Sequence, residues 1–216
     1  MPKTFYLWDL ANTLFPETWN KDKSGFVNYD EYVKSLGYNL ATIKPLEYEQ
    51  AYEIPYKDGY FDLTISPGFE ETLSWTKNNG VFTTGNKEQV DWRAVNFLPR
   101  YGFDIRDYLK EIYSTFDFGN TNLKTKEMLI ELCKKIHNGG FKVLVYTDDK
   151  QANCDFFLKA VESATGQGVK LDARVYNFEP SSQIAKEINP NYFVIANLAQ
   201  LLNNERELRE LKNLSL

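Results

Sequence analysis

Two short apolar segments of this chain each lead directly into an acidic residue. The first is Thr4–Asp9, and the second is Lys142–Thr147, which carries the continuous apolar run Val143–Val145 and is followed by Asp148 and Asp149. A short continuous apolar run is typical of a strand that is covered on both faces, as in a parallel sheet. The two segments therefore predict central strands of such a sheet.

Helical and extended patterns alternate along most of the chain, which is the signature of βαβ units. Further strands are expected over Val81–Thr84, Lys110–Thr115, Ala173–Phe178 and Tyr192–Ile195. Helices are expected over residues 67–78, 87–98, 125–137 and 197–212, with another that ends near Thr165. The predicted fold class is α/β, with a parallel sheet and helices on both faces.

The composition bounds the size and the partners of the protein. With 216 residues, 43% of them hydrophobic, the chain can bury one core domain plus an insertion. A net charge of -5 argues against affinity for nucleic acid or an anionic membrane, because both need clustered basic residues. No apolar run approaches the roughly 20 residues that span a bilayer. Two cysteines in expected helices and no secretory signal favour a reducing, cytoplasmic setting.

Residues 16–66 do not follow the alternation and form an expected insertion. The interval is rich in aromatic residues among many charges, with helices expected near Tyr29–Leu36 and Leu46–Tyr52. Most of its aromatic side chains are expected to pack a small subdomain, with one or two left to face a ligand. The domain prediction is a core of residues 1–15 and 67–216 with an inserted subdomain of residues 16–66.

Polar residues stand at the carboxyl ends of three predicted strands. These are Asp9, Thr84 and Asp148. In open parallel sheets, ligands bind beyond the carboxyl ends of the strands. Two carboxylates brought together at such an edge repel each other, and a hard divalent cation with oxygen ligands relieves that repulsion.

The same strand ends carry motifs. The segment Asp9–Thr13 reads D-L-A-N-T and resembles the first motif of the haloacid dehalogenase (HAD) superfamily, a hydrophobic strand followed by D-x-D-x-T. The segment Val81–Asn86 resembles the second motif, a strand that ends in Ser or Thr, and Tyr146–Asn153 resembles the fourth, an acid pair after the last core strand. The resemblance implies a HAD-like Rossmannoid sheet, with residues 16–66 as a small helical cap inserted after the first strand.

The resemblance also implies roles for individual residues. Asp9 would be the nucleophile and Thr84 the phosphate-binding hydroxyl, with Thr83 as the alternative if the strand is one residue out of register. The charge-neutralising lysine of the third motif would be Lys124 or Lys126. Lys124 is preferred, because the family lysine tends to lie just outside the helix.

The cofactor implied by the resemblance is Mg²⁺. Asp9 and Asp148 would ligate it, Ala11 would offer its backbone carbonyl, and Asp149 or Asn153 would orient its waters. The phosphate of the substrate would be held by residues of the first two motifs, Thr13, Gly85 and Asn86. The implied partner is a small phosphorylated molecule, and a homodimer is left open.

Ala11 stands where most of the superfamily has a second acid. That acid protonates a departing alkoxide, and general acid–base help is typically worth about 10²- to 10⁴-fold. Leaving groups that need no protonation, as in an acyl phosphate, stay compatible with Ala11. The phosphonoacetaldehyde hydrolases, a branch with D-x-A-G-T at this point, use a cap lysine as a Schiff base, and Lys44 and Lys57 are the candidates here. Haloacid dehalogenases also lack the second acid but use no metal, and nothing else in this sequence resembles them.

Two functional hypotheses follow. The first is a magnesium-dependent phosphohydrolase or phosphotransferase that acts on a small phosphorylated metabolite through an aspartyl phosphate on Asp9. The second is a catalytically silent relative that binds a phosphorylated ligand or a protein partner, favoured by Ala11, by Thr147 in place of Gly and by Asn153 in place of an acid. The single histidine, His137, argues against a Ser–His pair or a His-rich metal site.

Overall fold

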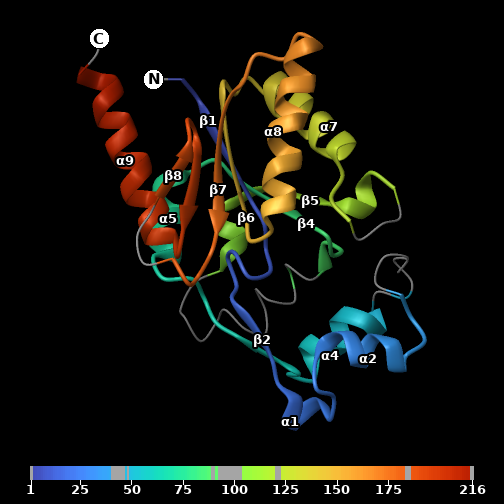
Figure 1. The fold of residues 1–216 in the computed structure, drawn as a ribbon. Helices are drawn as coiled ribbons and strands as arrows, with labels where there is room; N and C mark the ends of the chain where they lie inside the picture. The colour runs from blue at the N-terminus through green and yellow to red at the C-terminus, as the bar shows by residue number, and fades with distance from the viewer. Residues whose placement is uncertain are drawn as a thin grey trace.

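The computed structural model of the protein (Figure 1) places most of the chain. It describes residues 2–39, 47, 49–88, 91, 104–119, 123–182 and 186–214. Lys44 and most of the helix predicted over residues 87–98 lie outside the described residues. No helix of the described part combines the length and the apolar composition that crossing a membrane requires.

Within the described residues, seven strands form one central sheet (Figure 1). In spatial order they are β5 (Leu109–Ser114), β4 (Asn79–Thr83), β1 (Thr4–Trp8), β6 (Val143–Asp148), β7 (Asp172–Phe178), β9 (Tyr192–Ile195) and β8 (Lys186–Asn189). All neighbouring pairs are parallel except β8 and β9. The predicted α/β class with a parallel sheet is confirmed, with one antiparallel strand added at an edge.

Helices cover both faces of this sheet (Figure 1). One face carries α7 (Lys126–Asn138) and α8 (Gln151–Gly166), and the other carries α5 (Phe69–Thr76) and α9 (Leu198–Leu214). Side chains of β1 alternate between the two sides: Phe5 and Leu7 pack in the core under α7 and α8, and Tyr6 and Trp8 pack in the core under α5 and α9. This burial on both faces explains why the strand sequence is continuously apolar.

The described residues between 16 and 66 form a small inserted layer beyond the carboxyl end of β1 (Figure 1), and its Tyr56 and Leu63 join the core under α5 and α9. Its described elements are β2 (Glu17–Trp19), α1 (Lys21–Ser24), α2 (Tyr29–Ser35), the π-helical segment η2 (Glu49–Glu53), α4 (Ile54–Lys57) and β3 (Phe61–Leu63). Trp19 lies among other aromatic rings, with its centroid 5.6 Å from Tyr29 and 5.0 Å from Phe61. These aromatic side chains pack the inserted layer, as the sequence predicts for most of them.

Three local features differ from the sequence-based expectation. The strands β2 and β3 pair antiparallel, but each has three residues, which is too short for an alternating pattern to be visible. All four residues of β8 are exposed, so no apolar signal marked that strand. The helix predicted over Leu46–Tyr52 is π-helical from Glu49 on and continues into α4, while Leu46 itself lies outside the described residues.

Helix α9 is fixed to the sheet and to α5 by specific contacts. Its Glu205 is fully buried and accepts a hydrogen bond from the hydroxyl of Tyr6 at 2.9 Å. Glu205 also forms a bidentate ion pair with Arg174, whose Nε and Nη2 donate to its two oxygens at 2.7 and 2.6 Å. At the start of α5, Gly68 has a φ of +81°, and a Cβ there would lie 2.7 Å from the backbone nitrogen of Ala199. Only glycine fits this left-handed, closely packed position.

Candidate active site

The predicted acids meet because side chains alternate along two neighbouring parallel strands. Residues two apart on a strand point to the same face. Asp9 therefore follows Leu7, and Asp148 follows Tyr146, on the face covered by α7 and α8. Both carboxylates reach the same edge of the sheet, where β1 and β6 end.

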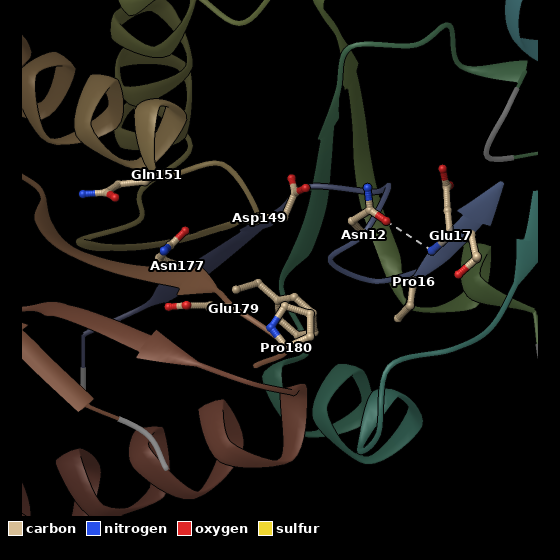
Figure 2. A pocket seen from close by; sticks show the side chains of 10 residues that line it. Asn12, Pro16, Glu17, Asp149, Gln151, Asn177, Glu179 and Pro180 are labelled. Carbon is tan, nitrogen blue, oxygen red and sulfur yellow. Dashed lines mark hydrogen bonds between the residues drawn. The ribbon is translucent and has the colours of Figure 1, made fainter. Parts of the chain in front are cut away.

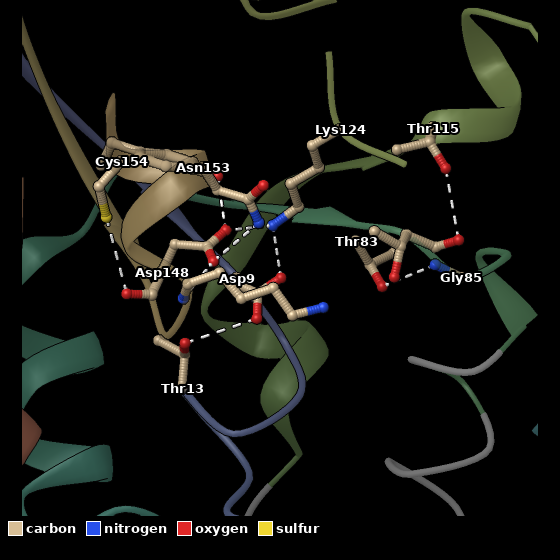
Figure 3. Close-up of polar contacts among 12 residues, drawn as sticks. Asp9, Thr13, Thr83, Gly85, Thr115, Lys124, Asp148, Asn153 and Cys154 are labelled. Carbon is tan, nitrogen blue, oxygen red and sulfur yellow. Dashed lines mark hydrogen bonds and ion pairs between the residues drawn. The ribbon is translucent and has the colours of Figure 1, made fainter. Parts of the chain in front are cut away.

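Lys124 joins these two carboxylates (Figure 3). Its Nζ lies 2.5 Å from Asp9 Oδ1 and 2.6 Å from Asp148 Oδ2, and its side chain is fully buried. Thr125 caps the helix that follows, because its hydroxyl accepts a hydrogen bond from a backbone N–H of the first turn. Lys126 is already inside that helix. Of the two lysines that the sequence left open, the structure brings Lys124 to the acids.

Asp148 is held by four hydrogen-bond donors. Lys124 and the hydroxyl of Tyr146 both donate to Oδ2, each at 2.6 Å. The side-chain amide of Asn153 and the backbone N–H of Lys150 both donate to Oδ1, each at 2.9 Å. Because each of its two oxygens accepts two hydrogen bonds, the orientation of this fully buried carboxylate is fixed.

The two carboxylate oxygens of Asp9 differ in how strongly they are held. Its backbone N–H donates to the carbonyl of Thr147 at 2.8 Å, and its Oδ1 pairs with Lys124. Among the described residues, its Oδ2 accepts a hydrogen bond only from the hydroxyl of Thr13, at the long distance of 3.5 Å. Asn12 adopts a left-handed conformation with φ of +58° between them, which turns the chain back so that Thr13 faces Asp9.

The charges of this site shift its pKa values in different directions. Burial raises the pKa of Asp9 to about 7, with Lys124 opposing the shift and Asp148 and Asp149 adding to it. Burial also raises the pKa of Asp149 to about 6, and Asp148 contributes in the same direction. For Asp148, burial is outweighed by Lys124 and the hydrogen bonds from Tyr146 and the backbone, so its pKa falls below the ordinary value. The site therefore concentrates more negative charge than Lys124 alone balances.

A hard divalent cation fits this donor set. Carboxylate oxygens of Asp9, Asp148 and Asp149 all lie within 4.8 Å of one another. These three carboxylates surround the buried ammonium group of Lys124, while the charge of Lys150 acts on Asp149. Oxygen donors of this kind are the ligands that Mg²⁺ and Ca²⁺ take in proteins. Ala11 is partly exposed in the loop that follows Asp9. This arrangement brings together the carboxylates that the sequence assigned to a metal.

The second-motif residues shape a turn at the end of β4. Thr83 is the last residue of the strand, and its hydroxyl accepts a hydrogen bond from the N–H of Gly85 at 3.0 Å. The carbonyl of Gly85 accepts a hydrogen bond from Ser114 at 2.5 Å, and that of Thr84 accepts one from Thr115 at 3.3 Å. The N–H of Gly85 thus donates to Thr83, and a role of Gly85 in phosphate binding stays a prediction.

Two other candidates contact Glu53 of the inserted layer. The side-chain amide of Asn86 donates to Glu53 Oε1 at 2.8 Å, so it joins the core to residues 16–66. Lys57 pairs with the other oxygen of Glu53 at 3.2 Å and is 47% exposed. Both side chains are therefore engaged with Glu53.

Sequence reasoning missed Tyr146 as a member of the site. Its hydroxyl contacts Asp148, and its ring packs at the same time under α8, stacked on Phe157 with centroids 4.7 Å apart. A tyrosine in an apolar strand looks like a core residue. The available signal was its position two residues before Asp148, which places both side chains on one face of the strand.

The fold and the acidic sheet edge together define a class of structure. A mostly parallel sheet with helices on both faces, an insertion after the first strand, and acids at the ends of β1 and β6 is a HAD-like Rossmannoid fold. No protein-family model matches the sequence, and no curated protein matches it significantly. The class is therefore defined by structure.

Solved structures of one enzyme bear out this fold. The chain is similar to the HAD family enzyme BT-2542 from Bacteroides thetaiotaomicron, with a TM-score of 0.54 and 14% sequence identity over 85% of this chain and 97% of that chain. Its complex with magnesium and inorganic phosphate gives a TM-score of 0.51 and 16% identity, over 85% and 97% of the two chains. Its magnesium complex gives 0.50 and 18%, over 85% and 96%. The HAD-like fold predicted from the motifs is confirmed.

Proposed function

We propose that this chain is a magnesium-dependent phosphohydrolase that acts on a small phosphorylated metabolite through Asp9. The observation that carries the proposal is the buried ion pair of Lys124 with both Asp9 and Asp148, with Asp149 beside them. The similar enzyme BT-2542 has been solved with magnesium and inorganic phosphate, which supports the same ligands here. Asp9, Asp148 and Asp149 would hold the cation, with the backbone carbonyl of Ala11 as a further oxygen. When bound, Mg²⁺ supplies positive charge against the phosphoryl oxygens.

The protein's own groups prepare Asp9 as a nucleophile. Lys124 holds Oδ1 of Asp9. Within the described part of the chain, Oδ2 has only the long contact with Thr13, and it is the oxygen that attacks phosphorus in this proposal. An Oδ2–P bond forms and the bond from phosphorus to the leaving oxygen breaks. Water then attacks the aspartyl phosphate, which releases inorganic phosphate and regenerates the carboxylate. Thr84, just beyond β4, is the proposed hydroxyl partner of the phosphoryl oxygens.

Ala11 sets the limits of this reaction. With no carboxyl group at this position, the leaving oxygen takes its proton from water, so strongly basic alkoxides leave slowly. The lack of this general acid is expected to lower the rate by about 10²- to 10⁴-fold relative to an enzyme that has one. Substrates with a weakly basic leaving group, such as acyl phosphates and activated esters, are therefore favoured.

The inserted layer of residues 16–66 is the proposed cap of this site. It lies beyond the carboxyl end of β1, and its Glu53 accepts a hydrogen bond from Asn86 of the core. Phe116 of the core packs against its aromatic cluster. Lys57 is exposed and paired with Glu53, so the described part of the insert gives no support to Schiff-base chemistry.

Turnover of a substrate panel tests the proposal. The panel contains phosphate esters, acyl phosphates and phosphonoacetaldehyde, each with and without Mg²⁺. We expect magnesium-dependent release of phosphate that Asp9→Asn abolishes and that Asp172→Asn preserves, because Asp172 lies at the opposite end of a core strand. Equal activity of Asp9→Asn and the native protein would refute the role of Asp9. No turnover, with phosphate still raising the melting temperature, would favour the catalytically silent alternative.

A further inference from the structure

A cavity of about 610 Å³ opens beside Asp149, next to the proposed metal ligands (Figure 2). One wall comes from the turn between β1 and β2, with Asn12 and Glu17. The opposite wall comes from the start of α8 and the end of β7, with Gln151, Asn177 and Glu179. The volume is in the range of ordinary small-molecule sites, which are about 300–1,000 Å³.

The lining of this cavity has one sign of charge. It contains the carboxylates of Glu17, Asp149 and Glu179, and none of its lining residues is Lys, Arg or His. Glu17 is fixed in place, because the hydroxyl of the buried Tyr56 donates to its Oε2 at 2.5 Å. The remaining polar lining consists largely of side-chain amides. A cavity of this composition attracts cations and hydrogen-bond donors and repels anions.

Asn177 offers a hydrogen-bond donor at the wall of the cavity. It is only 9% exposed and lines the cavity. Its Oδ1 lies 4.0 Å from the thiol of Cys154, and its side-chain nitrogen has no partner among the residues that the structure describes. This nitrogen is not among the buried polar atoms that lack a partner, so it is open to the cavity and can donate to a ligand or to water there.

We propose that this cavity receives the non-phosphate part of the substrate and that this part is an ammonium-bearing alcohol. The proposal deepens the phosphohydrolase function above and rests on it. Glu17 and Glu179 would neutralise the ammonium group, and the amide of Asn177 would donate to an oxygen of the alcohol part. The cavity lies next to Asp149, so a small phosphate ester can reach from the three acids into it.

The same substrate class suits Ala11. A positively charged nitrogen close to the leaving oxygen withdraws electrons, so the departing alkoxide is a weaker base than that of a simple alcohol. A weaker base needs less help from a general acid. Among alkyl esters, an amino-alcohol ester therefore depends somewhat less on the missing acid at position 11, although its leaving group is more basic than that of an acyl phosphate.

Matched phosphate esters test the charge preference. Phosphocholine and phosphoethanolamine carry a cation, glycerol phosphate is neutral beyond the phosphate, and phosphoglycolate carries a carboxylate. With Mg²⁺, we expect kcat/KM to fall in that order, by about tenfold or more between the first and the last, which corresponds to about 1.4 kcal/mol. Glu179→Lys should reverse or remove the preference. Glu187→Lys, on the exposed strand β8, should leave it unchanged.

Ligand binding without metal separates this proposal from the catalytic one. Choline, glycerol and glycolate are titrated into the native protein, with the side-chain NH₂ signal of Asn177 followed by NMR. We expect choline alone to shift that signal at millimolar concentration, and Glu179→Lys to weaken its binding. Choline binding with no turnover of any ester would support the cavity assignment and contradict the phosphohydrolase. Turnover with phosphoglycolate as the best substrate, or equal binding of choline and glycolate, would overturn the cavity assignment.

Discussion

Replacement of Lys124 by Met is the most informative perturbation of the site. The side chain is fully buried, and its ammonium pairs with both Asp9 and Asp148. Methionine keeps most of the volume of the stem and removes only the charge. The two carboxylates then face each other without their shared cation.

The size of the effect follows from burial. Removing one partner of a buried ion pair typically costs about 3–5 kcal/mol, because the remaining charge is left uncompensated. Asp148 is fully buried, whereas Asp9 is 7% exposed and can bind a proton, since its pKa is already raised to about 7. Lys124→Met is therefore expected to lower the free energy of unfolding by about 3 kcal/mol, the lower end of this range. For a chain of this size, that corresponds to a fall in Tm of about 6–12 °C.

Urea denaturation at pH 8 measures this cost, with Lys126→Met as the matched control. Lys126 is the neighbouring lysine, is partly exposed and begins α7. We expect Lys126→Met to change the stability by less than about 0.5 kcal/mol, as surface substitutions usually do. Added Mg²⁺ should narrow the gap between Lys124→Met and the native protein, since a cation then returns to the acids. Equal stability of Lys124→Met and the native protein, or a larger effect of Lys126→Met, would refute the assignment of Lys124.

Three further predictions concern the chemistry, the metal and the packing. Ala11→Asp should raise the turnover of esters with basic leaving groups by up to about 10²- to 10⁴-fold and that of acyl phosphates much less, as measured by phosphate release; equal gains for both classes would contradict the role given to position 11. The raised pKa of Asp9, about 7, means that Asp9 contributes stability to the metal-free protein at low pH, which is lost as the pH rises through 7. The increase in Tm on adding Mg²⁺ should therefore be larger at pH 8 than at pH 6, and a smaller increase at pH 8 would contradict this. Gly68→Ala should cost about 1–3 kcal/mol in urea denaturation, because its Cβ meets the backbone of Ala199, whereas Gly25→Ala has a similar φ of +76° but open space, so it should cost clearly less.

The sequence predicted the core of the fold because its strong signals are local. Strands β1 and β6 are continuously apolar and end on acids, and Thr125 caps α7 as expected from its residue type. Sheet order cannot be derived in this way, because it depends on which strands pair far along the chain. The antiparallel edge strand β8 was missed, since an exposed four-residue strand carries no apolar pattern.

The acids of the candidate site could be predicted from the sequence, but the residues that hold the acids in place were harder to predict. Asp9, Asp148 and Asp149 are recognisable by their position after apolar strands. The choice between Lys124 and Lys126 depends on how the chain enters α7, which spacing alone does not determine. Tyr146 resembles a core residue because it lies in an apolar strand, although its hydroxyl donates a hydrogen bond to Asp148.

Detection of a phosphoryl group on Asp9 tests the proposed reaction most directly. The native protein is mixed with Mg²⁺ and an excess of its best substrate, quenched in acid within milliseconds, and digested for mass spectrometry. We predict that the peptide containing Asp9 carries one added phosphoryl group, and that Asp9→Asn gives none. A productive enzyme with no phosphoryl group on this peptide, or with the group on another residue, would contradict the account.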